Sequence, residues 1–123
     1  MLKKSGVLLL VLSLAIAAAQ RIFVYQSACD MRRSFDRLAA MVEHELHCDV
    51  MRGDYFLFSN RRRTMVKLLY WDGDGFAIWY KRLERGRFRM GTKAELDRAE
   101  LSLLLEGVEA RELRRLPRYK KHA

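Results

Sequence analysis

The stretch Leu68-Leu-Tyr-Trp-Asp-Gly-Asp-Gly-Phe-Ala-Ile-Trp-Tyr-Lys-Arg-Leu-Glu-Arg-Gly86 decides how the chain folds. Two apolar runs rich in aromatic and β-branched residues flank Asp72-Gly73-Asp74-Gly75. Asp-Gly between runs of this kind is a strong local signal for a β-hairpin, because glycine supplies the positive φ that tight turns need. We therefore predict a central β-hairpin over about residues 65–82.

Each arm of this hairpin alternates in polarity, which is typical of a strand with two different faces. The expected apolar face is made by Val66, Leu68, Tyr70, Phe76, Ile78 and Tyr80, and the opposite face by Lys67, Trp71, Trp79 and Lys81. Indole rings and ammonium groups suit a covered sheet face with two core tryptophans. They equally suit a binding face, so Trp71 and Trp79 are candidates for contact with a partner.

Sequence on either side of the hairpin predicts a small α+β domain with a mostly antiparallel sheet. Strands are expected at residues 21–25 and 55–58, and a short one at Phe88. Ser27 and Asp30 have the spacing of a capping box, which predicts a helix over about residues 28–47. Its expected buried stripe consists of Met31, Phe35, Leu38, Val42 and Leu46.

A second, shorter helix is expected over about residues 98–107. Asp97 and Glu100 again have capping-box spacing, and Gly107 is a typical residue for ending a helix. Thr92 and Glu95 offer an alternative, earlier start. Leu101, Leu104, Leu105 and Val108 would form its apolar face.

The two ends of the chain differ from the middle. Residues 1–20 combine two early lysines, an apolar run and a row of alanines, which is typical of a secretory signal. We favour instead an upstream extension, such as a misassigned start, before a domain at residues 21–109. Residues 110–123 form a basic tail that we expect to be disordered in the free protein. The preferred location is cytoplasmic and nucleoid-associated, and export is the alternative.

The net charge of +9 and a pI near 10 point to a polyanionic partner. DNA or RNA is the commonest such partner inside a cell, and membrane headgroups or an acidic protein are the competing candidates. The expected nucleic-acid contacts are Arg32, Arg33, Arg37, Arg61, Arg62, Arg63, Lys81, Arg82, Arg85, Arg87, Arg114, Arg115, Arg118, Lys120 and Lys121. Among them, the triplet Arg61–Arg63 is placed at a strand turn, where three arginines are expected to project into water.

No catalytic, metal or cofactor site is expected, and no small-molecule substrate. His44, His47 and Cys48 are close in sequence, but their spacing lacks the second ligand pair that a zinc site normally needs. The available carboxylates are Asp30, Asp54, Asp72, Asp74 and Glu84, and several of these have turn or capping roles. Cys29 and Cys48 are interpreted as reduced thiols.

Three separated blocks of the chain resemble a known family. They are Cys29–Leu38, the run from Tyr70 to Phe88 around the predicted hairpin turn, and Leu103–Val108. In this order they are similar to the small accessory protein of IS-sixty-six-type bacterial insertion sequences, usually called TnpB and unrelated to the RNA-guided nuclease of that name. The resemblance covers about residues 21–109.

This resemblance implies a non-catalytic protein required for transposition, whose partners are the separately encoded transposase, DNA, or both. The DNA partner would be either the transposon ends or DNA of any sequence. One alternative is a pure protein-interaction subunit that docks on the transposase and does not bind DNA itself. The other alternative, an exported basic protein, depends on residues 1–19 alone.

Overall fold

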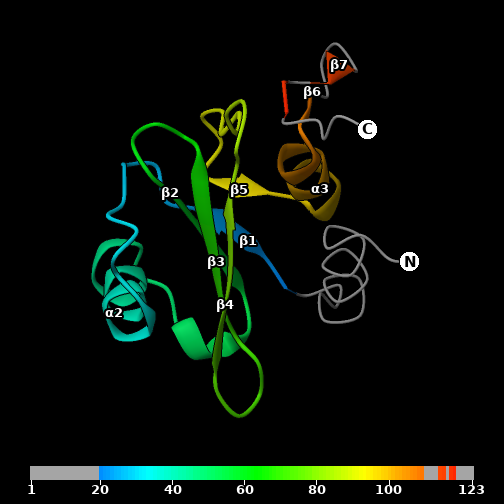
Figure 1. Cartoon of the computed structure of the whole chain (residues 1–123). Helices are drawn as coiled ribbons and strands as arrows, with labels where there is room; N and C mark the ends of the chain where they lie inside the picture. The colour runs from blue at the N-terminus through cyan, green and yellow to red at the C-terminus, as the bar shows by residue number, and fades with distance from the viewer. Residues whose placement is uncertain (1–19, 110–113, 116, 119–123) are drawn as a thin grey trace.

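The computed structural model describes residues 20–109, 114–115 and 117–118 (Figure 1). The predicted features of residues 1–19 lie outside this part of the chain. The elements are β1 (Ile22–Val24), α2 (Phe35–Glu45), the 3-10 turn η1 (Val50–Arg52), β2 (Tyr55–Ser59), β3 (Met65–Trp71), β4 (Phe76–Arg82), β5 (Glu95–Leu96), α3 (Arg98–Glu106), β6 (Val108–Glu109) and β7 (Arg114–Arg115).

Strands β1 to β5 form one sheet in the order β4-β3-β2-β1-β5. Neighbours run antiparallel except β1 and β2, which are parallel, with Phe23 opposite Phe56. A parallel pair needs a long crossover, and α2 together with η1 supplies it. The predicted α+β class and mostly antiparallel sheet are confirmed, whereas hairpin connections alone do not account for β1.

The sheet separates two hydrophobic cores, and central strand β2 contributes to both. Tyr55 and Leu57 lie in the core that α3 covers, while Phe56 and Phe58 lie in the core that α2 covers. Figure 1 accordingly shows α2 and α3 on opposite sides of the sheet. All five residues of β2 are buried, because each of its faces meets a helix-covered core.

The β3–β4 hairpin forms as predicted, but the residues of β3 share a face with other residues of β4 than predicted. Leu68 pairs with Trp79 and Leu69 with Ile78, and residues directly opposite one another lie on the same face. The predicted grouping of Leu68 with Ile78 is therefore wrong. The four-residue connection at residues 72–75 opposes even-numbered residues of β3 to odd-numbered residues of β4, which the alternation within each arm could not reveal.

Helix α2 begins at Phe35, seven residues later than predicted. The carboxylate of Asp30 does not cap a helix but accepts a bond from the backbone N–H of Arg32. Ser34 occupies the N-cap without a side-chain hydrogen bond, and Phe35 is 43% exposed instead of buried. The buried face of the helix consists of Leu38, Met41 and Val42.

Helix α3 closely follows its sequence signals. Asp97 and Glu100 form the predicted capping box, and Gly107 ends the helix in the left-handed conformation. The earlier start at Thr92 is not used. The short strand expected at Phe88 is wrong, because the fifth strand of the sheet is β5, which pairs antiparallel with β1.

Gly73 provides a direct test of the hairpin turn, since its φ is 78°. A β carbon there would meet no atom within 4 Å, so backbone strain is the only obstacle to substitution. Gly73→Val should lower the free energy of unfolding by about 1–2 kcal/mol. Gly75 lacks a positive φ and is equally open, so Gly75→Ala is the matched control. Urea denaturation curves should separate the two variants, and equal stability would contradict this account of the turn.

Candidate nucleic-acid interface

Two arginine-bearing loops are joined at one end of the sheet. The first is the β2–β3 turn at residues 60–64, and the second is the segment at residues 83–90 that follows β4. The backbone N–H of Leu83 donates to the carbonyl of Thr64 at 2.8 Å, and that of Phe88 to the carbonyl of Arg63 at 2.7 Å. We use the name basic end for five of the exposed arginines here: Arg61, Arg62, Arg82, Arg85 and Arg87.

The predicted triplet Arg61–Arg63 divides into two kinds of side chain. Arg61 and Arg62 are exposed, as predicted. Arg63 is half-buried, and its Nη1 donates to Ser59 Oγ at 2.7 Å. Its φ of 60° reverses the chain within the turn, which directs its side chain back to the end of β2. The expectation that all three project into water is therefore wrong for Arg63.

The residues at the end of β4 also differ among themselves. Arg82 donates to the Glu84 carboxylate at 2.8 and 3.0 Å, in a pair that is exposed to solvent. Arg85 and Arg87 make no ion pair with a carboxylate among residues that the structure describes. Lys81 is half-buried, and burial followed by the nearby Arg118 lowers its pKa.

The opposite end of the same two strands is acidic. The β3–β4 turn, at the bottom of Figure 1, carries Asp72 and Asp74, and both are exposed. The loops of the basic end lie at the top of that view. Because β3 and β4 each span seven residues, the hairpin keeps these two charge groups well apart. The sheet therefore has an electrostatic polarity along its strands.

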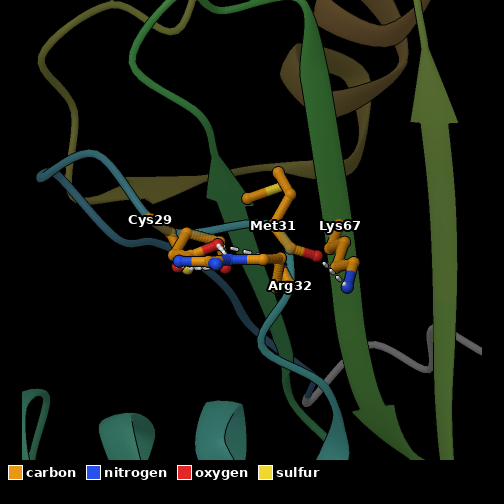
Figure 2. A network of polar contacts seen from close by, with 5 residues as sticks. Cys29, Met31, Arg32 and Lys67 are labelled. Carbon is orange, nitrogen blue, oxygen red and sulfur yellow. Dashed lines mark hydrogen bonds and ion pairs between the residues drawn. The ribbon is translucent and has the colours of Figure 1, made fainter.

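Asp30 and Arg32 form a paired group beside the basic end. The Cys29 backbone N–H donates to the carbonyl of Ser59, which attaches this segment to the end of β2. Arg32 Nη2 lies 2.7 Å from Asp30 Oδ2, and these bonds lower the pKa of Asp30 to about 2 (Figure 2). Both side chains reach solvent, so the Arg32 charge is partly neutralised in the free protein.

Lys67 holds the segment before α2 against the sheet. Lys67 is buried, with 7% of the residue exposed. Its Nζ donates to the carbonyl of Met31 at 2.7 Å (Figure 2) and to that of Arg33 at 2.7 Å. The ammonium also lies 4.7 Å from the centre of the Tyr80 ring. Because these carbonyls are engaged by Lys67, the segment does not continue the helix toward residue 28, which explains the late start of α2.

Arg33 and Arg37 were predicted as contacts together with Arg32, and the structure brings all three around one hollow. This open hollow of about 710 Å³ is also lined by the exposed ring of Phe35. Arg37 is exposed there, whereas Arg33 is half-buried and directs its Nη1 to Met41 Sδ at 3.0 Å. Of the three, Arg37 retains the most available charge.

Described residues of the C-terminal tail contact the rest of the fold. Arg114 and Arg115 form β7, which pairs with β6. Arg118 Nη1 donates to the carbonyl of Arg87, and its guanidinium lies 5.4 Å from the centre of the Phe88 ring. The expected disorder is therefore wrong for these residues, while Lys120 and Lys121 lie outside the described residues.

Two glycines permit this approach of the tail. A β carbon on Gly86 would meet the carbonyl oxygen of Pro117 at 1.8 Å, and one on Gly107 would meet the guanidinium carbon of Arg118 at 2.7 Å. Only residues without a side chain leave this space. Arg118, predicted as a phosphate contact, is therefore engaged within the fold.

Trp71 and Trp79 lie on opposite faces of the hairpin. Trp79 packs against the core covered by α3, whereas Trp71 makes an edge-to-face contact with Phe76 at 5.0 Å. Phe76 in turn packs against the core covered by α2. The single face predicted to carry both indoles is therefore wrong, although each indole remains partly accessible.

Asp54 and the two cysteines are held within the fold. Asp54 is buried and accepts from the backbone N–H of Arg21, with Arg52 3.4 Å from its carboxylate. Cys29 and Cys48 are free thiols, and burial raises the pKa of both. Within the described residues no group of three or more His, Cys, Asp and Glu side chains could hold a metal, and no helix is long and apolar enough to cross a membrane.

Sequence reasoning missed two residues that shape this interface. The sequence predicts Lys67 on the same face as the two tryptophans, whereas the structure buries it and uses it to position the segment that contains Arg32. Phe88 was assigned to a strand, but it joins the two arginine loops and supports Arg118. Its setting between Arg87 and Arg89 was a signal for an aromatic anchor in a basic loop.

Comparison with known proteins assigns the chain to a family. The family described as IS66 Orf2 like protein matches residues 20–115. The uncharacterized protein y4hO of Sinorhizobium fredii (strain NBRC 101917 / NGR234) is 34% identical over 95 residues, 74% of this chain and 83% of that protein. The uncharacterized protein y4jC of the same strain is 33% identical over 101 residues, which are 79% of this chain and 86% of that protein. No solved structure matches significantly.

The chain therefore belongs to the IS66 Orf2-like family, which confirms the resemblance found in its sequence. Members of this family are accessory proteins of insertion sequences and are not known as catalytic enzymes. The chain accordingly has an accessory role associated with transposition.

Lys67→Met tests the attachment of the segment before α2. The substitution keeps an apolar stem but leaves the carbonyls of Met31 and Arg33 without their donor, so it should lower the free energy of unfolding by about 1–3 kcal/mol. Lys93→Met is the matched control, because Lys93 is exposed and its solvent-screened pair with Glu100 contributes little to stability. Similar losses in denaturant titrations of both variants would exclude a special role for Lys67.

The titration of Asp30 tests the Arg32 pair. A lowered pKa means that the pair is fully formed above the ordinary carboxyl pKa of 3.8 and is lost as the pH falls through about 2. Arg32→Ala should raise the pKa of Asp30 toward 3.8 in a carboxyl NMR titration. Arg37→Ala, which changes an arginine of the same hollow, should leave it in place. An unchanged pKa in Arg32→Ala would rule out this pairing.

Proposed function

We propose that the chain contributes to transposition by binding DNA through the basic end of its sheet. The observation that carries the proposal is the pair of backbone hydrogen bonds that joins the β2–β3 turn to the segment after β4. These bonds bring Arg61 and Arg62 together with Arg85 and Arg87, which are separated by more than a whole hairpin in sequence. A clustered set of exposed arginines is the usual footprint of phosphate binding.

The charge of this end supports the same proposal. Among the described residues, no carboxylate pairs with Arg61, Arg62, Arg85 or Arg87, so their positive charge is available to a partner. At this end Glu84 pairs with Arg82. With a net charge of +9 over the whole chain, long-range attraction favours the approach of a polyanion. The acidic β3–β4 turn repels the polyanion and so directs it toward the basic end.

The remaining predicted contacts take two roles in this proposal. Arg32 and Arg37 extend the basic surface beside the α2 hollow, where a phosphate would compete with Asp30 for Arg32. Arg33, Arg63 and Arg118 are engaged within the fold and position the surface. Arg114, Arg115, Lys120 and Lys121 belong to the basic tail, for which we retain the expectation of added, salt-sensitive affinity.

The alternative function is a subunit that docks on the transposase and does not bind DNA itself. The exposed ring of Phe35, which lines the α2 hollow, favours a protein contact there. Trp79→Ala is a poor test of this alternative, because Trp79 packs against the core and its loss would affect folding. Phe35→Ala removes an exposed ring instead, so it should weaken transposase capture without changing DNA affinity.

A salt titration of DNA binding tests the proposed function. For the double variant Arg61→Ala/Arg62→Ala, the slope of log affinity against log salt should be shallower by about two, since each phosphate contact releases about 0.9 counterion. The loss should be similar for unrelated duplex sequences, because phosphate contacts carry no sequence information. Fluorescence anisotropy of labelled duplexes measures both quantities.

The matched control is Arg98→Ala, which removes an exposed arginine at the start of α3. Arg98 follows β5 at the end of the sheet that lies away from the basic end, where Leu96 pairs with Ile22. It should leave the slope unchanged, and thermal melts of each variant report on folding. An intact protein that binds no DNA at low salt would refute the proposal and leave the transposase-docking subunit as the better one. An equal slope change in Arg98→Ala would exclude the basic end as the binding surface.

A further inference from the structure

Strand β4 is a long edge strand with an outer side that no described strand covers. It lies at one end of the sheet order and spans seven residues, whereas the strand at the other edge, β5, spans two. Natural proteins usually shorten, bulge or charge such edges, because unpaired backbone groups recruit another strand. β4 pairs with β3 without a bulge, contains no proline, and has no charged residue before Lys81.

Two hydrogen bonds identify the backbone groups of β4 that face outward. Asp72 N–H donates to Gly75 at one end of the hairpin, and Leu83 N–H donates to Thr64 at the other. In an antiparallel pair, residues that bond across the ladder alternate with residues that face away from it. Counting from either end, Phe76, Ile78, Tyr80 and Arg82 therefore present their backbone N–H and C=O groups to the outer side.

We propose that β4 pairs antiparallel with β4 of a second copy of this chain, about a two-fold axis at Trp79. In this register Ile78 of each copy lies opposite Tyr80 of the other, and Phe76 opposite Arg82. Every outward-facing residue then meets an outward-facing residue, so all seven positions of the strand are used. The two sheets join into one continuous sheet with an isologous interface.

The charge polarity of the hairpin favours a second copy in this orientation. The acidic turn precedes β4 with Asp72 and Asp74, whereas the cations Lys81, Arg82 and Arg85 lie at the far end of the strand and outnumber the one carboxylate there, Glu84. Antiparallel pairing brings the acidic turn of each copy beside the cations of the other. A parallel arrangement would instead place like charges side by side, which is unfavourable. The strand is thus electrostatically complementary to itself in the antiparallel direction only.

The side chains of β4 are consistent with further burial. Tyr80 is 49% exposed. Each residue from Phe76 to Trp79 is only half-buried. In the proposed register the two Trp79 side chains lie opposite each other at the axis, on the face covered by α3. Aromatic pairs in this position stabilise antiparallel strands.

The first test is the mass of the full-length chain in solution, which requires no DNA and is independent of the proposed function. Light scattering after size exclusion should give twice the chain mass of 14.5 kDa. Tyr80→Pro removes an outward N–H and leaves the bonds to β3 intact, so it should give a monomer. Tyr80→Ala also loses the ring but keeps the N–H, and it should remain dimeric.

A monomeric intact chain at micromolar concentration would overturn the proposal, and so would a dimer that survives Tyr80→Pro. Circular dichroism shows whether each variant is folded. If Tyr80→Pro does not fold, the register is tested by cross-linking instead. In chains carrying Cys48→Ala, a mixture of Ala77→Cys and Lys81→Cys copies should form an intermolecular disulfide on mild oxidation, because residues 77 and 81 lie opposite each other across the axis.

Ala77→Cys alone in the same background is the matched control, since residue 77 lies opposite residue 81 of the second copy and not opposite itself. It should stay reduced under the same conditions. Equal cross-linking of Ala77→Cys alone and of the mixture, or none in the mixture, would exclude the proposed register.

Discussion

The burial of β2 on both faces is the constraint on which the rest of the structure depends. Its side chains alternate between two cores, with Leu57 on one side of the sheet and Phe56 on the other. A strand in this position requires a cover on each face, and α2 and α3 provide these covers (Figure 1). A shift of one residue in its pairing with β1 or β3 would exchange the contents of both cores, so the register is strongly specified.

The basic end is a consequence of this arrangement. Because β2, β3 and β4 form successive antiparallel pairs, the β2–β3 turn and the end of β4 meet at the same end of the sheet. Arg63 and Phe88 then join the two loops through a backbone hydrogen bond. The side chains of Arg61, Arg62, Arg85 and Arg87 are therefore not needed to hold the loops together. Lys67 adds the segment before α2 to the same region, so one buried cation positions exposed ones.

Sequence alone predicted the features that depend on local signals. The hairpin turn, the capping box at Asp97 and the end of α3 at Gly107 each require only a few neighbouring residues. The exposure of Arg61 and Arg62 was predictable for the same reason. The parallel place of β1 and the burial of Lys67 depend on partners far away in the chain, whereas the sharing of faces between β3 and β4 depends on the length of their connection. The Lys67 contacts, for example, span 34 and 36 residues, and no local pattern encodes them.

During synthesis, β1 emerges first but acquires its neighbours in an unusual order. Its parallel partner β2 becomes available only after the whole of α2, and its antiparallel partner β5 only after the β3–β4 hairpin. Until residues 95–96 leave the ribosome, one side of β1 has no strand to pair with. Contacts of such sequence separation slow folding, because loop closure precedes the gain from pairing. One side of β1 therefore stays unpaired for most of the chain's translation, and β5, although only two residues long, is the strand that covers it.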